Sequence, residues 1–167
     1  MRLETGRLVI RSLAASDVAN YAALVADPEV MRYIGDGNAV DEAQARAYIE
    51  NCIENERTVG FSRYALELKS SSKFVGFCGY APVDDYVDFG YRIAREYWGN
   101  GYVGEAAQAI IKYGFERLGF DCIVAIAYIE NERSIRVMKK LGFEFECPDT
   151  LNGQNAVRYR KRNSTFD

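Results

Sequence analysis

The chain has 167 residues and a mass of 18.9 kDa, which suits one hydrophobic core, so we expect a single domain over residues 1–167. Its formal net charge of −3 argues against a nucleic-acid partner, because binders of that class neutralise phosphates with an excess of basic residues. No apolar run approaches the roughly 20 residues of a membrane span, and the N-terminus lacks a signal pattern. These features predict a cytoplasmic protein without a membrane partner.

The residue inventory narrows the chemistry further. Histidine is absent, which excludes histidine-based triads and leaves a carboxylate, a tyrosine, a lysine or a held water as general base. The four cysteines are irregularly spaced and form no C-x-x-C pair: Cys52, Cys78, Cys122 and Cys147. We interpret them as reduced core residues and expect no metal site.

In the first half of the chain, a strand at Arg7–Leu13 is followed by a helix that Ser16 would cap. Asp27-Pro28 ends that helix, and a polar stretch leads to a second helix at about Asp41–Glu56. Three strands separated by turn residues follow, at Phe61–Leu68, Phe74–Tyr80 and Tyr86–Ile93. Their short connections predict an antiparallel meander.

The second half has a different pattern. Apolar residues from Val103 to Leu118 recur at helical spacing, which is the strongest periodic signal in the sequence. The apolar run Cys122–Ile129 indicates a strand buried on both faces and parallel to Tyr86–Ile93. A helix at about Glu132–Leu141 ends at Gly142, and strands near Phe143–Cys147 and Asn155–Arg160 flank a turn at Asn152-Gly153. The fold class is therefore α/β with a mixed sheet.

A glycine-rich turn, Gly99-Asn100-Gly101-Tyr102-Val103-Gly104, joins the third meander strand to the strongest helix. Glycines permit close backbone approach, and the first amides of a helix have no intrahelical partner. Together they predict a site for a phosphate-bearing ligand, with a plain turn as the alternative. The spacing also matches a dinucleotide-binding motif, but Asp121 precedes its strand and the upstream strands are antiparallel, so we reject that interpretation.

Several blocks of sequence resemble one family. They are Glu4–Arg11, Asp88–Ile93, Glu96–Tyr102 with Glu105-Ala106, Asn131–Ser134 and Lys140–Phe143. The chain resembles the GNAT N-acetyltransferases, and within them the ribosomal-protein alanine N-acetyltransferase (RimJ/RimL-type) branch. This resemblance implies acetyl-CoA as cofactor and direct transfer of its acetyl group to a primary amine in a ternary complex. It also implies a mostly antiparallel sheet of six or seven strands, with a central splayed parallel pair and about four helices.

The resemblance assigns roles to particular residues. The backbones of Tyr91, Arg92 and Ile93 would pair with the pantetheine amides. The backbone amides that would hold the pyrophosphate are those of Gly99, Asn100, Gly101, Tyr102, Val103 and Gly104. Val103 departs from the family's usual Gly or Ala, which is tolerable if only its backbone faces the phosphate. Asn131 would reach the pantetheine arm, or act simply as a helix N-cap.

Two residues are candidates for proton transfer. Asp88 lies on the strand face opposite Phe89 and Tyr91, and its place in the family motif makes it our candidate base, acting through water. Alternatively, it is a solvated strand residue or a neighbour of Arg92. The tyrosine with which the superfamily commonly protonates the thiolate is replaced by Met138. In the ribosomal-protein branch a serine takes that role, and Ser134 matches it, although Ser134 could equally bond to backbone at the helix start.

The acceptor amine stays open. A protein N-terminus and a small amine, such as an antibiotic or polyamine, both require Asp27–Asp41 and Pro148–Gln154 to line the acceptor groove. Acidic residues in these segments would favour a cation: Asp27, Glu29, Asp36, Asp41 and Asp149. A non-catalytic acyl-CoA sensor is the third possibility. We interpret the basic run Arg158, Arg160, Lys161 and Arg162 as a solvated sheet edge, ahead of a contact with the 3′-phosphate, and Glu105 as a structural residue suited to the helix dipole.

Overall fold

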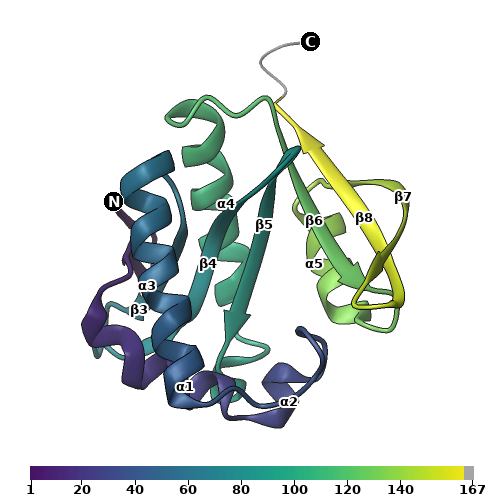
Figure 1. The fold of residues 1–167 in the computed structure, drawn as a ribbon. Coiled ribbons are helices and arrows are strands. Elements are labelled where there is room, and N and C mark those ends of the chain that lie inside the picture. Colours follow the sequence, from purple (N-terminus) through teal and green to yellow (C-terminus); the bar gives the residue numbers. More distant parts are fainter. Residues whose placement is uncertain (164–167) are drawn as a thin grey trace.

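The computed structural model describes residues 1–163, which form one mixed sheet with helices on both faces (Figure 1). The strands are β1 (Arg2–Glu4), β2 (Leu8–Ser12), β3 (Arg63–Leu68), β4 (Phe74–Val83), β5 (Tyr86–Ile93), β6 (Cys122–Tyr128), β7 (Glu144–Leu151) and β8 (Gln154–Arg162). The helices are α1 (Val18–Val25), α2 (Pro28–Met31), α3 (Glu42–Val59), α4 (Tyr102–Glu116) and α5 (Glu132–Lys140), with 3₁₀ turns η1 (Ala15–Asp17) and η2 (Arg95–Tyr97). None of these helices is both long and apolar enough to cross a bilayer.

The α/β class and the mixed sheet are confirmed, but the expected numbers of strands and helices were too low. The sheet has eight strands in the order β1-β2-β3-β4-β5-β6-β8-β7, and residues 1–163 contain five α-helices. The additional strand, β1, has three residues, of which Arg2 and Glu4 are charged, so it carries no apolar alternation. The additional helix, α2, is a single turn that starts at Pro28, where Asp27 caps it by accepting from the Glu29 amide (2.9 Å).

The strand pair at the centre of the sheet diverges. β5 and β6 are parallel and share one bridge, Asp88 with Val124, whereas β4 pairs with β5 along the whole length of β5. Figure 1 shows the two strands separating toward their carboxyl ends. The expected splayed parallel pair is therefore present, and the β5 edge beyond Asp88 has no strand beside it.

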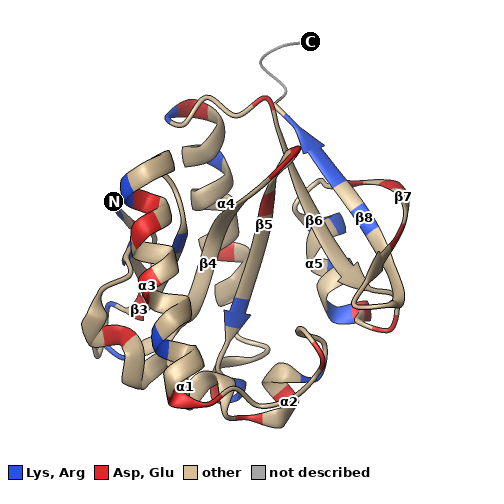
Figure 2. Ribbon diagram, viewed as in Figure 1, with Lys and Arg blue, Asp and Glu red and all other residues tan. Residues whose placement is uncertain are grey.

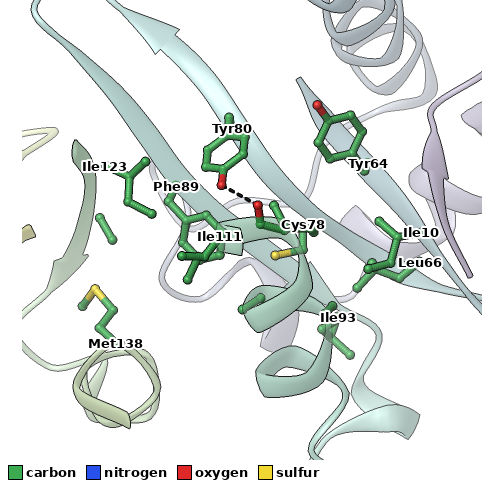
Figure 3. Packing of buried hydrophobic residues seen from close by; sticks show 14 of the residues in the cluster. Ile10, Tyr64, Leu66, Cys78, Tyr80, Phe89, Ile93, Ile111, Ile123 and Met138 are labelled. Carbon is green, nitrogen blue, oxygen red and sulfur yellow. Dashed lines mark hydrogen bonds between the residues drawn. The ribbon is translucent and has the colours of Figure 1, made fainter. Parts of the chain in front are cut away.

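Two apolar clusters hold the helices to the sheet. One lies between the sheet and α4 with α5, and its centre is shown in Figure 3; the other lies under α1, α2 and α3. The Tyr80 hydroxyl donates to the Ile110 carbonyl (2.8 Å), the dashed line in Figure 3, which ties α4 to β4. The clusters place α1–α3 on one face of the diverging strands and α4 and α5 on the other.

Two local expectations were wrong. Ser16 does not cap α1; it lies in η1, and the next residue, Asp17, is buried in an ion pair with Arg11 (2.7 Å). The basic run near the C-terminus is not a solvated edge, because β8 lies between β6 and β7. Two of its arginines form cross-strand ion pairs, Arg158 with Asp149 (2.8 Å) and Arg160 with Glu146 (2.6 Å).

Candidate active site

A cleft of about 1230 Å³ opens where β5 and β6 diverge. Its walls are β5, the glycine turn, the start of α4, the carboxyl half of β6 and the exposed face of α5. A smaller hollow of about 310 Å³ adjoins it, and both are lined by Asp88. The cleft thus connects the glycine turn to the proposed base.

The glycine turn presents unpaired amides to this cleft. Gly99 and Gly101 both have φ of +78°, a conformation that side chains rarely adopt, and Gly101 is the N-cap of α4. The first helical bond is from the Glu105 amide to the Gly101 carbonyl (3.1 Å), so the amides of residues 102–104 have no intrahelical partner. A Cβ built on Gly99 or Gly104 meets no atom within 4 Å. Open space over unpaired amides at a helix N-terminus fits a diphosphate.

A charged network fixes the turn to the first strands. Glu105 accepts from the Thr5 hydroxyl (2.5 Å), the Arg7 amide (2.7 Å) and Arg7 Nε (2.7 Å). Arg7 Nη1 also donates to the Asn100 carbonyl (2.9 Å). Partial burial opposes the charge of Glu105, but the bonds from Thr5 and Arg7 outweigh it and hold its pKa below the usual value. The structural interpretation of Glu105 agrees with these contacts, and Asn100 also has a holding role, since its Nδ2 donates to the Tyr97 carbonyl (3.1 Å).

The opposite wall carries cations that sequence analysis did not assign to the cofactor. Arg133, Arg136 and Lys140 line the cleft from α5, and the Arg133 guanidinium lies 5.2 Å from the centre of the Trp98 ring. Helical spacing of three and four residues places such side chains on one face, so the signal was present in the sequence. These side chains line the same cleft as the glycine turn, and Arg136 is paired with Glu132 (3.1 Å), so Arg133 and Lys140 are the cations that could complement a negatively charged ligand.

Asn131 and Ser134 are brought together at the start of α5. Asn131 is the N-cap, and its Oδ1 accepts from the Ser134 amide (3.2 Å), so the simple capping role is observed. The Ser134 hydroxyl lies in the cleft and accepts from the Tyr91 hydroxyl (3.2 Å). Burial raises the pKa of Tyr91 to about 12, so this phenol stays protonated. Met138 is 2% exposed and belongs to the core, so it offers no acid at that position.

The backbone of β5 alternates between its two neighbours. The Ala94 amide donates to the Val75 carbonyl (2.9 Å) on the β4 side, so the backbone groups of Arg92, two residues earlier, also face β4. The backbone groups of Tyr91 and Ile93 face the gap toward β6. There, Trp98 Nε1 donates a hydrogen bond to the Ile93 carbonyl oxygen (2.7 Å). The expected pairing of Arg92 with pantetheine is therefore not favoured, whereas Tyr91 and the Ile93 amide face the cleft.

Asp88 is engaged in an ion pair that the sequence did not reveal. Its Oδ2 accepts from Nη2 of Arg63, whose side chain is 11% exposed. Arg63 Nη1 also donates to the carbonyl oxygens of Gly79, Asp88 and Gly90, so Arg63 is fixed against β4 and β5. Asp88 is thus a positioned carboxylate whose charge is balanced, and the alternative of a plain solvated residue does not describe it.

The smaller hollow beside Asp88 is lined mostly by uncharged side chains and is crossed by hydrogen bonds. The smaller hollow is lined by Tyr33, Ile34, Gly35, Tyr86, Ile126, Tyr128, Leu151 and Asn152, and Asp88 is the only charged residue in its described lining. The Gly35 carbonyl accepts from the Tyr128 hydroxyl (2.6 Å) and from Asn152 Nδ2 (2.8 Å). The loop after α2 and the β7–β8 turn therefore meet as expected, and they form a bridge beside Asp88.

The acidic residues expected in this groove are mostly engaged elsewhere. Asp27 pairs with Arg95 (3.1 Å) and Asp149 with Arg158. Asp36 binds Asn38 (2.9 Å), and Asp41 caps α3 by accepting from the Gln44 amide (2.8 Å). Of the five, Glu29 alone is in the described lining of the cleft, and it is exposed. The predicted acidic groove is therefore wrong, because local capping and pairing use these carboxylates.

Comparison with known proteins agrees with this geometry. The profile of the acetyltransferase (GNAT) domain matches residues 7–144. The uncharacterized protein YkkB of Bacillus subtilis (strain 168) is 34% identical over 149 residues, covering 86% of each chain. A GNAT-family acetyltransferase from Bacillus anthracis has a TM-score of 0.85 at 24% identity, covering 97% of this chain and 98% of its own.

A further solved structure shares the fold. RimL, a ribosomal L7/L12 alpha-N-protein acetyltransferase in complex with coenzyme A, has a TM-score of 0.83 at 16% identity and covers 97% of this chain and 98% of its own. The profile match spans most of the chain, and it includes β5, the glycine turn and α5, the elements that form the cleft. The chain belongs to the GNAT N-acetyltransferases.

Proposed function

We propose that this acetyltransferase carries its cofactor in the splayed cleft and transfers the acetyl group directly to the α-amine of a chain end or to a small primary amine. The observation that supports the proposal most is the convergence of three features on one cleft. They are the open amides of Gly99–Gly104, the Tyr91–Ser134 pair and the Asp88 carboxylate. A non-catalytic sensor would need neither the Tyr91–Ser134 pair nor the Asp88 carboxylate.

The bound acetyl-CoA supplies the acyl thioester and a thiolate leaving group. The amides of the glycine turn would hold its diphosphate, with Arg133 and Lys140 on the opposite wall. Tyr91 and Ile93 would pair with the pantetheine arm through the backbone groups that face the gap. Asn131 Nδ2 is left for the same arm, because its Oδ1 is occupied by the cap.

Two groups are assigned to the chemistry, one that takes a proton and one that stabilises the leaving thiolate. Asp88 would take the proton of the attacking amine through a water, since Arg63 fixes the carboxylate against the sheet. Ser134 would donate a hydrogen bond to the departing thiolate, which can leave as the anion and take its proton from solvent because thiols titrate near 8.5. The Tyr91 hydroxyl donates to Ser134 Oγ, so the serine's own proton is free to point toward sulfur.

The choice of acceptor depends on the basicity of its amine and on the hydrogen-bonded bridge at Gly35. An α-amine with a pKa near 8 is about a tenth neutral at pH 7, whereas a lysine amine would cost about 4.6 kcal/mol to neutralise. A carboxylate that already balances Arg63 is suited to the α-amine and poorly suited to the lysine amine. Among small amines, the same argument favours those that are less basic than lysine. The bridge at Gly35 also obstructs a continuous chain passing through the hollow, which favours a terminal or small amine over an internal lysine.

A thiol-release assay tests the proposal. The protein is given acetyl-CoA and a panel of N-terminal peptides, lysine peptides and small amines, and free coenzyme A is measured. We expect release with terminal or small amines and little with N-terminally blocked lysine peptides. Release with the blocked lysine peptides alone would contradict the acceptor assignment, and binding of acetyl-CoA without release on any amine would contradict the proposed transfer.

A further inference from the structure

Arg92 is a cation without a counter-ion. Its side chain lines the cleft on the acceptor side of β5, yet it forms no ion pair with any of residues 1–163. Nη1 bonds the Tyr21 hydroxyl (3.0 Å) and approaches Met31 Sδ (3.8 Å), while Nε is buried and has no hydrogen-bond partner among the described groups. The guanidinium lies 5.3 Å from the Phe77 ring centre and 5.9 Å from that of Tyr48. Aromatic faces attract a cation but leave its charge uncompensated.

The charges around Arg92 leave the acceptor side positive. Asp88 and Arg63 balance one another, so Arg92 adds one net positive charge to this wall. Of the carboxylates in the neighbouring loops, Asp27 is balanced by Arg95. Asp36 and Asp41 keep their charge in a hydrogen bond to Asn38 and in the cap of α3, but neither lines the cleft. Glu29 and Arg32, of opposite charge, are both exposed at the rim. An unpaired, half-buried cation is costly, and a ligand anion would relieve that cost.

Arg92 lies on the same strand face as the proposed base. Asp88, Gly90 and Arg92 alternate with the residues that face α4 and α5, and Figure 2 shows the acidic and basic positions of β5 in red and blue. Gly90 has no side chain, and the floor there is covered by the Arg63 guanidinium, 3.1 Å from a Cβ built on Gly90. With about 3.3 Å per residue, the Cα atoms of Asp88 and Arg92 are about 13 Å apart, and the two side chains shorten the space between the charged groups. The carboxylate and the guanidinium thus bracket a space that suits a molecule with a charged group at each end.

We propose that Arg92 forms an anion subsite, so that the acceptor is a primary amine that also carries a carboxylate. The amine lies at Asp88 and the carboxylate at Arg92. This assignment rests on the proposed function, and it disfavours polyamines and polycationic antibiotics, which would bring further positive charge beside Arg92. A free amino acid and the acidic second residue of a peptide supply the same chemistry.

Matched pairs of acceptors test the subsite. We would measure kcat/KM by thiol release for α-amino acids, β-alanine, 4-aminobutyrate and 6-aminohexanoate, each against its own amide. Dipeptides whose second residue is Asp or Asn test whether the carboxylate comes from a peptide side chain rather than from a free amino acid. Spermidine and tyramine serve as acceptors that carry no carboxylate. The amide of an α-amino acid has the less basic amine and is more often neutral, so intrinsic reactivity favours the amide. We expect at least one acid to exceed its amide by about tenfold to a hundredfold.

Variants assign that preference to Arg92. Arg92→Gln should reduce the acid-to-amide ratio to about one, and Arg92→Lys should keep part of it. Arg117→Gln, the same charge change at an exposed residue that does not line the cleft, should leave the ratio unchanged. Thermal unfolding and coenzyme A titration of each variant show that it is folded. If Arg92→Gln is unfolded, the comparison of wild type with Arg92→Lys carries the test.

A binding measurement is independent of turnover. In calorimetry on protein saturated with coenzyme A, the N-acetylated acid should bind more tightly than its N-acetylated amide, and Arg92→Gln should abolish the difference. Amides equal to or better than acids, or an unchanged ratio in Arg92→Gln, would overturn the subsite. Turnover of spermidine or tyramine with no turnover of any acid would overturn it while leaving the proposed transfer intact. Failure of every amine together with failure to bind acetyl-CoA would reject the proposed function itself.

Discussion

At the residue scale, the Tyr91–Ser134 hydrogen bond can be tested by removing one hydroxyl group at a time. Ser134→Ala removes the proposed donor, and we expect kcat to fall about tenfold to a hundredfold with little change in acetyl-CoA affinity. Tyr91→Phe keeps the ring and removes the hydroxyl that orients Ser134, so we expect a smaller loss, about threefold to tenfold. Steady-state kinetics measure both.

A double variant separates a joint action from two independent ones. If Tyr91 acts through Ser134, Tyr91→Phe has no further effect in the Ser134→Ala background. Multiplied losses would show that the two hydroxyls act separately. Full turnover in Ser134→Ala would remove this serine from the mechanism.

Asp88 has a structural and a chemical role, and one substitution affects both. Asp88→Asn leaves the Arg63 guanidinium without its carboxylate, so we expect a loss of about 2 kcal/mol in the free energy of unfolding, less than for a fully buried pair because Asp88 is 24% exposed. Denaturant titration measures this loss, and the pH–rate profile from pH 6 to 9 measures the chemical part. Asp88→Glu, which keeps the charge, is the control for stability. Full turnover of Asp88→Asn over that pH range would exclude Asp88 as the base.

At the element scale, the start of α4 is a position where a substitution can weaken ligand binding without destabilising the fold. Gly104 is helical, and a Cβ there meets no atom of the protein, so Gly104→Ala should preserve or slightly raise stability, by about 0.5 kcal/mol. The same methyl group projects into the space assigned to the diphosphate. We therefore expect the dissociation constant for coenzyme A to rise at least about tenfold while the unfolding temperature does not fall. Lys112→Ala, on the exposed side of the same helix, is the control and should not weaken the binding of coenzyme A. An unchanged dissociation constant in Gly104→Ala would place the diphosphate elsewhere.

The hydrogen bonds and the ion pair of Glu105 make the stability of the protein depend on pH. Its pKa is held below the usual value of about 4.3, so its contribution to stability is complete above that value and is lost as the pH falls through the lowered pKa. Glu105→Gln removes the charge, and we expect a loss of about 1–2 kcal/mol near pH 7, moderated by solvent at the half-exposed Arg7. The difference from wild type should shrink below about pH 4, as measured by denaturant unfolding. A difference that is constant down to pH 3 would contradict this role.

Periodic elements were predictable from the sequence, and contacts between distant segments were not. The boundaries of β5, α4 and β6 follow from alternation or helical spacing, which are local properties. β1 and α2 were missed because three and four residues are too short to show a period. The Arg63–Asp88 pair joins residues 25 apart, and the Tyr128–Gly35 bond joins residues 93 apart. Such pairs depend on strand order and loop path, which no local pattern records.

At the scale of the whole molecule, the divergence of β5 from β6 places a cleft between two helical layers. The glycine turn and α5 face it from one side, and Asp88, Arg63 and Arg92 from the other. A cofactor on the first side and an acceptor on the second would meet at the gap between the strands. The resemblance to the family correctly predicted the splayed strand pair that opens the cleft, whereas the charge around Arg92 became clear only when the partner of each acidic side chain was known.

The most direct test of the account is calorimetry of coenzyme A and of pantetheine with the folded protein. Because the account assigns the diphosphate to the unpaired amides of the glycine turn, we expect one coenzyme A to bind per chain and pantetheine, which lacks the phosphates, to bind at least about a hundredfold more weakly. Equal affinity for the two ligands, or no heat with coenzyme A or acetyl-CoA, would contradict it.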